Sequence, residues 1–297
     1  MFDSYYRCHL CPNRCNVNRT DNEVGICGQT DKVKIAWTGL HKGEEPPISG
    51  DNGSGMIFFT GCPLHCQYCQ NYQISKENLG YEISGNKLSL IMLELQNKGA
   101  ETVNLVTGTH FIPTITESLI LSKKTGLKIP VVWNSSGYED VESLSFIDPY
   151  IDIYLLDAKT LSVVTASKFC GTSAYADVIP GVLDYLYKNR REGDVIIRHL
   201  VFPGEIGSTA DFLHYFADRY KDKFLLSLMF QFVNPYGGKS GKVSDKISEK
   251  DYEYLADLTD RLEIDGFIQE CGDESYWVPD FNRKNPFPDE FATPVCI

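Results

Sequence analysis

The sequence predicts an α/β fold, a partial (β/α)6 TIM-like barrel that follows a small, irregular, cysteine-rich N-terminal module. Two patterns lead to this prediction. After residue 55, short apolar runs alternate about six times with amphipathic stretches, which indicates parallel strands joined by helices. Seven of the ten cysteines fall within the first 69 residues, and residues 1–50 show no helical period. About six strand–helix units are too few for a closed eight-unit barrel but enough for a partial one.

The chain is expected to divide into a metal-binding module over residues 1–50 and a barrel domain over residues 51–297. The first segment is rich in Cys, Asn, Gly and Pro, and it ends in the turn-rich stretch EEPPISGDNGSG. We therefore expect the module to be irregular and held together by its thiols.

Six apolar runs are expected to be strands buried on both faces, at 56–60, 102–107, 129–134, 151–157, 194–202 and 224–232. Helices are expected between them where apolar residues recur three and four positions apart. Two such sets are Leu88, Ile91, Met92 and Leu95, and Ile179, Val182, Leu183 and Leu186. Further helices are expected around 113–125, 208–220 and 248–263.

The composition limits the class of partner and the compartment. The net charge of −12 argues against nucleic acid, because phosphate binding needs an excess of Lys and Arg. The start, MFDSYYRCHL, lacks the apolar stretch of a signal peptide, and the longest apolar run, 224–230, is too short to span a membrane. We therefore expect a cytoplasmic protein with no membrane partner. In that reducing compartment, clustered thiols bind metal or do redox chemistry more often than they form disulfides.

The pattern with the most chemical content is Cys62-x3-Cys66-x2-Cys69, which directly follows the expected strand MIFFT. Three thiolates can hold three irons of a 4Fe-4S cluster, whereas a structural zinc or an electron-carrier cluster takes four protein ligands. The fourth iron would then be open to a substrate or cofactor. The alternative is a zinc or ferredoxin-like site completed by a remote fourth ligand.

This loop, with the aromatic Tyr68 before its last cysteine, resembles the signature of radical S-adenosylmethionine (SAM) enzymes. The resemblance implies that the amino and carboxylate groups of SAM chelate the open iron. It also implies that an electron from the cluster cleaves SAM to methionine and a 5'-deoxyadenosyl radical, which abstracts hydrogen from a substrate. Cys62, Cys66 and Cys69 are the catalytic cluster ligands in this interpretation.

Further segments are similar to the branch related to pyruvate formate-lyase activating enzymes, in particular to its relatives with a cysteine-rich N-terminal extension. They are FFTGCPLHCQYCQNYQIS, NLVTGTHFIP, WNSSGYE, LLDAK, IIRHLVFPG and QFVNPYGG. The resemblance implies an electron donor such as flavodoxin or ferredoxin, and a glycyl-radical protein as the partner that loses hydrogen. A small-molecule substrate, a peptide modification and a non-catalytic electron-transfer module are the alternatives.

The resemblance also implies SAM contacts at the ends of later strands. Thr107, Gly108 and Thr109 stand where many members have Gly-Gly-Glu, so backbone carbonyls and hydroxyls would have to receive the SAM ammonium. Asn134, Ser135 and Ser136 resemble a polar patch for the carboxylate and ribose, with an Asn/Ser-Gly turn as the alternative. His110 is either a site residue or a packing histidine.

Tyr68, Asp157, Lys159, Arg198 and Gln231 complete the expected cofactor-binding set. Asp157 and Lys159 alternate along one strand and so face the same way, and burial of either charge favours a mutual or a ligand-paired role. Arg198 lies in an apolar strand and needs an anionic partner, for which the SAM carboxylate and Asp157 are the two candidates. Gln231 ends the sixth expected strand.

The module contains a second group of thiols, Cys8-x2-Cys11-x3-Cys15-x11-Cys27. Four thiolates close a site, and both zinc and an iron-sulfur cluster accept such a set. We expect a metal there, and the alternative is that some of these thiols are buried apolar or redox-active residues. Cys170, Cys271 and Cys296 are isolated and are expected to be structural.

Overall fold

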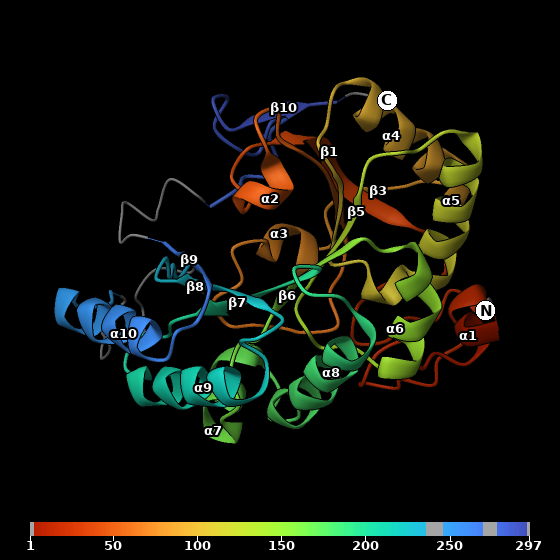
Figure 1. Cartoon of the computed structure of the whole chain (residues 1–297). Coiled ribbons are helices and arrows are strands. Elements are labelled where there is room, and N and C mark those ends of the chain that lie inside the picture. The colour runs from red at the N-terminus through yellow and green to blue at the C-terminus, as the bar shows by residue number, and fades with distance from the viewer. Residues whose placement is uncertain (1–2, 236–245, 270–277, 296–297) are drawn as a thin grey trace. The chain divides into compact units, whose positions relative to one another are not determined.

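The computed structural model describes residues 3–235, 246–269 and 278–295. The chain forms two compact units, and Figure 1 shows their elements. The first unit comprises Met1–Leu64, Asn71–Ile153 and Pro279–Ile297, and the second comprises His65–Gln70 and Tyr154–Val278. The predicted boundary near residue 50 stays a prediction. None of the helices in the described ranges is long and apolar enough to cross a membrane.

The first unit contains a mixed sheet. Its strands are β1 (Lys34–His41), β2 (Ser54–Phe59), β3 (Tyr81–Glu82), β4 (Val103–Val106), β5 (Val131–Ser135) and β10 (Ala292–Pro294). β2, β4 and β5 are parallel neighbours, while β1 runs antiparallel to β2, β3 and β10. The helices are α1 (Asp3–Tyr6), α2 (Pro46–Ser49), α3 (Tyr72–Ser75), α4 (Gly85–Asn97), α5 (Ile112–Thr125) and α6 (Val141–Ile147), with 3-10 turns η1 (Arg19–Asp21), η2 (Thr109–Phe111) and η3 (Asp148–Tyr150).

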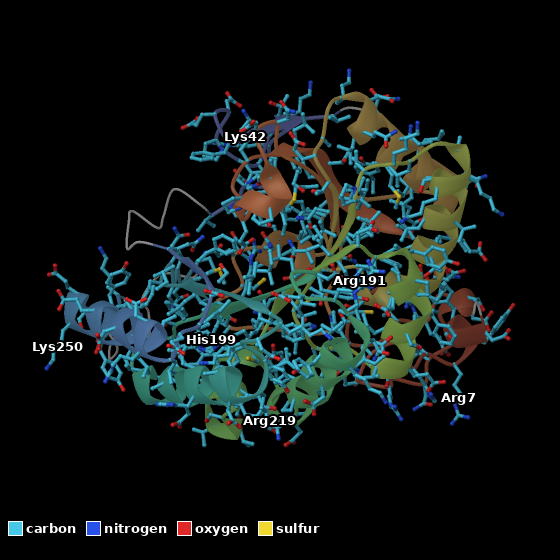
Figure 2. All side chains as sticks on the ribbon, in the orientation of Figure 1. Arg7, Lys42, Arg191, His199, Arg219 and Lys250 are labelled. Carbon is cyan, nitrogen blue, oxygen red and sulfur yellow. The ribbon has the colours of Figure 1, made fainter. Side chains whose placement is uncertain are left out.

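The second unit is a parallel sheet with helices in its connections. Its strands are β6 (Ile153–Asp157), β7 (Val195–Leu200), β8 (Leu225–Met229) and β9 (Gly266–Ile268), paired in that order. The helices are α7 (Val163–Thr165), the π-helical turn η4 (Ala166–Cys170), α8 (Tyr175–Asn189), α9 (Ile206–Arg219) and α10 (Glu249–Arg261). Figure 2 shows Lys250 and Arg219 on the outer helices of this unit, whereas His199 lies within it and is buried.

Local signals in the sequence explain where the helices begin and end. Ser84, Asp140 and Ser248 accept backbone N–H groups in the first turns of α4, α6 and α10. Gly126 ends α5 in the left-handed conformation, which glycine adopts without a steric cost. The apolar faces of α4 and α8 are buried as their spacing predicts.

The six expected strands and five expected helices are all present, which confirms the α/β class. The structure differs within the N-terminal module, where residues 34–41 form β1 and residues 3–6 and 46–49 form short helices instead of irregular chain. Most side chains of β1 are buried because β2 and the C-terminal segment cover it, and this burial depends on distant partners. The three-residue strands β9 and β10 are too short for a recognisable period.

Candidate functional site

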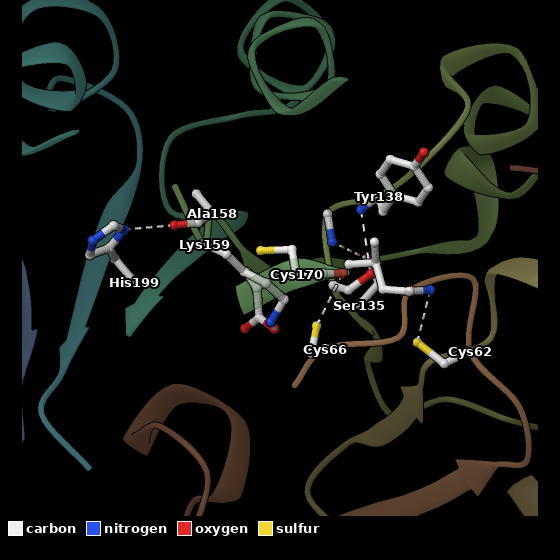
Figure 3. Close-up of polar contacts among 12 residues, drawn as sticks. Cys62, Cys66, Ser135, Tyr138, Ala158, Lys159, Cys170 and His199 are labelled. Atoms are coloured by element: carbon white, nitrogen blue, oxygen red, sulfur yellow. Dashed lines mark hydrogen bonds and ion pairs between the residues drawn. The ribbon is translucent and has the colours of Figure 1, made fainter. Parts of the chain in front are cut away.

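The first half of the cysteine loop leaves β2 through a sharp turn. Gly61 has a φ of +86° and donates its N–H to the carbonyl of Ile74 at 2.9 Å. Cys62 follows, and its Sγ accepts the N–H of Leu64 at 3.4 Å (Figure 3). The Cys62 side chain is half-buried and has no disulfide partner. An N–H group directed at sulfur favours the thiolate, which is the form that binds metal.

The second half of the loop is held by residues 169–171 of the second unit. The Gln67 N–H donates to the carbonyl of Phe169 at 2.9 Å, and the Cys66 Sγ lies 4.0 Å from the carbonyl oxygen of Cys170 (Figure 3). A Cβ on Gly171 would come within 2.7 Å of the His65 carbonyl, so glycine permits the close approach. Cys170 was expected to be an isolated, structural cysteine. The structure places it against Cys66, a contact across 104 residues that no local pattern reveals.

Tyr68 anchors the same half of the loop. Its ring packs against Phe169, Phe202 and Phe232 with centroids 6.3, 5.0 and 5.6 Å away. The Lys159 ammonium lies 5.7 Å from the ring centroid. Burial raises the pKa of Tyr68 well above its usual value, so the phenol stays neutral. Tyr68, which was predicted to contact the cofactor, is therefore held in an aromatic cluster at a position between Cys66 and Cys69 in the sequence.

The donor set of this loop fits a 4Fe-4S cluster. Cys62, Cys66 and Cys69 are not in disulfides, and Cys62 and Cys69 are half-buried. Among the residues that the structure describes, no three His, Cys, Asp or Glu side chains form a group that would hold a metal ion. In a 4Fe-4S cluster each thiolate binds a different iron, so the three sulfurs need not converge on one ion.

The turn after β4 is fixed to β5. Thr107 has a φ of +59°, an unusual conformation for a β-branched residue, and its N–H donates to the Asn134 carbonyl at 2.8 Å. A Cβ on Gly108 would meet Ile115 at 2.7 Å and Trp133 at 3.0 Å. Only glycine therefore fits at the centre of this turn.

Glu139 holds the far side of the turn and was missed from the sequence. Its Oε1 accepts the Thr109 hydroxyl at 2.9 Å and the Trp133 indole N–H at 3.1 Å. Its other oxygen has no hydrogen-bond partner among the described residues, and the side chain is buried. Burial raises the pKa of Glu139, and the hydrogen bonds it accepts oppose that rise. The turn at residues 107–109 contains no acidic residue. Its Thr109 hydroxyl is instead hydrogen-bonded to the carboxylate of Glu139, which follows β5.

His110 is a packing residue that links strand ends. It is buried, and its Nε2 donates to the Thr60 carbonyl at 2.8 Å. Burial, assisted by the charge of Arg19, lowers the pKa of His110 to about 3. The ring is therefore neutral at physiological pH.

The polar patch at the end of β5 divides into two parts. Asn134 is half-buried, and its Nδ2 lies 3.5 Å from the Oε2 of Glu44, a contact at the limit of a hydrogen bond. The Ser135 and Ser136 hydroxyls accept the N–H groups of Gly137 and Tyr138 at 3.3 and 3.4 Å (Figure 3). The two serine hydroxyls therefore also take part in an Asn/Ser-Gly turn.

Asp157 and Lys159 form an ion pair of 2.6 Å at the end of β6. The Tyr175 hydroxyl donates to the Asp157 carbonyl at 2.7 Å and accepts the Lys159 N–H at 3.0 Å. Burial is the largest single effect and acts to lower the pKa of Lys159, but the negative charges around it, that of Asp157 foremost, together raise the pKa well above its usual value. Lys159 is therefore a permanent cation here. Arg198 lies opposite Asp157 in the β6–β7 register, and Gln231 is half-buried after β8.

The four N-terminal cysteines lie near one another. Burial raises the pKa of Cys11 to about 12, and the charges of Cys27, Cys8 and Cys15 add to the rise. The Cys15 Sγ accepts the Ile26 N–H at 3.4 Å. All four thiols are free of disulfides.

Arg19 is fully buried beside these thiols. Its Nη1 donates to the His110 carbonyl at 2.5 Å and lies 4.0 Å from the Cys8 Sγ. Its other hydrogen bonds go to the carbonyls of Gln29 and Thr30, and its guanidinium lies 4.7 Å from the centroid of the Tyr5 ring. No carboxylate of the described residues forms an ion pair with it. No local pattern in the sequence marks Arg19 as a buried cation.

The chain is similar to several known proteins. An uncharacterized protein of Methanocaldococcus jannaschii, MJ0674, is 28% identical over 276 residues, which cover 88% of this chain and 76% of its own. Crystal structures of Streptococcus suis SuiB, one bound to precursor peptide SuiA and one to S-adenosylmethionine, match with a TM-score of 0.52 at 14% identity. The match covers 71% of this chain and 47% and 48% of the SuiB chains, so this chain spans about half the length of SuiB.

At that identity the likeness to SuiB shows the fold alone, and it confirms the predicted partial barrel class. The family model of the Radical SAM superfamily matches residues 56–216, more than half of the 297 residues. The match includes the three-cysteine loop and the ends of β2, β4, β5, β6 and β7. The chain belongs to the radical SAM superfamily.

Proposed function

We propose that the protein is an enzyme that cleaves S-adenosylmethionine reductively and uses the product to remove hydrogen from a substrate. The observation that supports this most is the Cys62, Cys66 and Cys69 loop directly after β2 in a member of this superfamily. Membership implies a 4Fe-4S cluster and SAM. When bound, the reduced cluster supplies the electron that cleaves SAM to methionine and a 5'-deoxyadenosyl radical.

The chain's own residues have separate roles in this proposal. The three thiolates hold three irons, and Tyr68 fixes the loop between Cys66 and Cys69. The Thr107, Gly108 and Thr109 turn receives the SAM ammonium on backbone and hydroxyl oxygens. Asn134 and Ser136 contact the carboxylate and ribose. Asp157, Lys159, Arg198 and Gln231 are the further polar residues proposed to bind the cofactor.

Product analysis tests the proposal. We expect reconstituted protein to form 5'-deoxyadenosine from SAM only when a strong reductant is added. Cys66→Ala should abolish the product, because it removes one of three ligands, whereas the matched control Cys296→Ala should retain it. Equal product formation by wild type and Cys66→Ala would contradict the proposal.

For the substrate, we favour a backbone glycine of a glycyl-radical partner, because several segments resemble the activating-enzyme branch. An electron donor such as flavodoxin or ferredoxin, and a cytoplasmic location that keeps the thiols reduced, belong to the same proposal. A peptide or small-molecule substrate is the second candidate, and the likeness to SuiB, crystallised with its precursor peptide, favours the peptide. Deuterium placed on the partner glycine should appear in 5'-deoxyadenosine, and unlabelled product would contradict the glycine assignment.

We also propose a second metal at Cys8, Cys11, Cys15 and Cys27. The fully buried Arg19 supports it, because a cation without a carboxylate needs a counter-anion and four metal-bound thiolates supply one. The side chains would have to close in on the ion, since they do not form such a group here. Metal analysis of Cys8→Ser should show loss of zinc, or of additional iron, relative to wild type. An unchanged metal content would contradict this site.

A further inference from the structure

We infer that the N-terminal module is a positioning device for Cys62, with Asn13 as the residue that transmits its position. This inference rests on the proposed function only in that the cysteine loop holds a cluster. It assigns the module a role that is independent of which metal the module binds.

The residues on both sides of Cys62 contact the module. After Cys62, the Pro63 carbonyl accepts the Nδ2–H of Asn13 at 2.7 Å in a partly buried contact. Before Cys62, a Cβ on Gly61 would come within 2.6 Å of the Cys27 carbonyl and 2.6 Å of the Gln29 side chain. Gly61 therefore lies directly against the module, and the Cys62 backbone is held from both directions.

The three module residues in these contacts, Asn13, Cys27 and Gln29, are in or close to its thiol-bearing segments. Asn13 lies between Cys11 and Cys15, in a turn closed by the Arg14 N–H and the Cys11 carbonyl at 3.0 Å. The other contact is made by the carbonyl of Cys27 itself. A change in the conformation of the module's thiols would therefore move the groups that hold Cys62. By linkage, a filled cysteine loop stabilises the module to the same extent.

A second residue of the same module turn, Arg14, contacts a different loop and provides a control variant. Arg14, next to Asn13, pairs with Asp140 at 2.8 Å, but its side chain is 62% exposed. An exposed ion pair contributes little to stability, whereas a partly buried hydrogen bond to a backbone carbonyl contributes more. Arg14→Ala therefore perturbs the same turn without touching the cysteine loop.

Thiol accessibility tests the inference. The tryptic peptide 43–76 contains no internal Lys or Arg, and Cys62, Cys66 and Cys69 are its only cysteines, so it reports on the loop separately from the module. Reconstituted protein is incubated anaerobically with an iron chelator and an alkylating reagent, and alkylation of this peptide is followed by mass spectrometry. The proteins compared are wild type, Asn13→Ala, Asn13→Asp and Arg14→Ala.

We expect Asn13→Ala to raise the alkylation rate about threefold to tenfold, the range for loss of one hydrogen bond. Asn13→Asp keeps the size but has no N–H donor, so it should raise the rate at least as much. Arg14→Ala should stay within about twofold of wild type. Wild-type rates in both Asn13 variants, or an equal rise in Arg14→Ala, would overturn the inference.

The same samples separate this inference from the proposed function. If the wild type forms no 5'-deoxyadenosine but the Asn13 variants lose the cluster faster, the proposed reaction fails and the positioning role stands. If an Asn13→Ala preparation does not fold, Asn13→Asp and the alkylation of cluster-free protein still decide the question. Equal labelling of peptide 43–76 in cluster-free wild type and Asn13→Asp would then overturn it.

Discussion

Glu139 shows how one buried carboxylate joins two strand ends. It accepts hydrogen bonds from Thr109 after β4 and from Trp133 in β5. Glu139→Leu would leave both donors buried without a partner. We expect a loss of about 2–4 kcal/mol in the free energy of unfolding, measured in denaturant. Glu139→Gln still offers an acceptor, so it should lose clearly less; an equal loss in both variants would contradict this account of the contact.

His110 should make stability depend on pH. Burial lowers its folded pKa to about 3, while the unfolded value is near 6.5, so below that pH the unfolded chain binds more protons. The stability that neutral His110 contributes is complete above about pH 6.5 and falls as the pH drops toward 3. The slope should reach about 1.4 kcal/mol per pH unit for this group. Unfolding of reduced, metal-free protein at several pH values measures it.

His110→Asn should reduce that slope, because asparagine does not titrate. His199 provides a second contribution of the same sign, since burial lowers its pKa to about 4. The carbonyl of Ala158 lies 2.6 Å from its Nδ1 (Figure 3). The Thr209 hydroxyl lies 3.1 Å from its Nε2. The single variant should therefore retain part of the pH dependence. An unaltered slope would show that His110 is not neutral in the folded protein.

At the scale of elements, the turn between β4 and α5 depends on Gly108. Gly108→Ala would place a Cβ against Ile115 and Trp133, which are buried in the core. We expect a loss of about 1–3 kcal/mol from this overpacking, together with weaker SAM binding by reconstituted protein. The control is Gly181→Ala in α8, where a Cβ meets nothing within 4 Å. That helical position should gain about 0.5–1 kcal/mol.

The elements themselves were largely predictable from the sequence. Strands such as β2 and β4 are buried on both faces, so they read as continuous apolar runs, and α8 shows its buried face in the spacing of Ile179, Val182 and Leu183. β1 was not predictable in this way, because its burial depends on β2 and β10. The candidate site residues at the ends of the strands were found by resemblance to a known family. The residues that hydrogen-bond to them were not found from the sequence.

The missed site residues share one physical reason. Glu139, Arg19 and Cys170 act on residues 30, 91 and 104 positions away, and hydrogen bonds across such separations leave no periodic pattern. The cysteine triad was recognisable because its three members lie within eight residues of one another. Sequence therefore supplied the candidate cluster ligands, and the structure was needed to find the residues that hold their loop and the neighbouring turn in place.

At the scale of the whole molecule, the central claim is that the cysteine loop leaves one iron of its cluster open to SAM. The most direct measurement is the electron paramagnetic resonance spectrum of the reduced, reconstituted protein with and without SAM. We expect SAM to change the spectrum of the wild type, and Cys66→Ala to show no such change. A wild-type spectrum that is identical with and without SAM would indicate a closed cluster and would contradict an iron open to SAM.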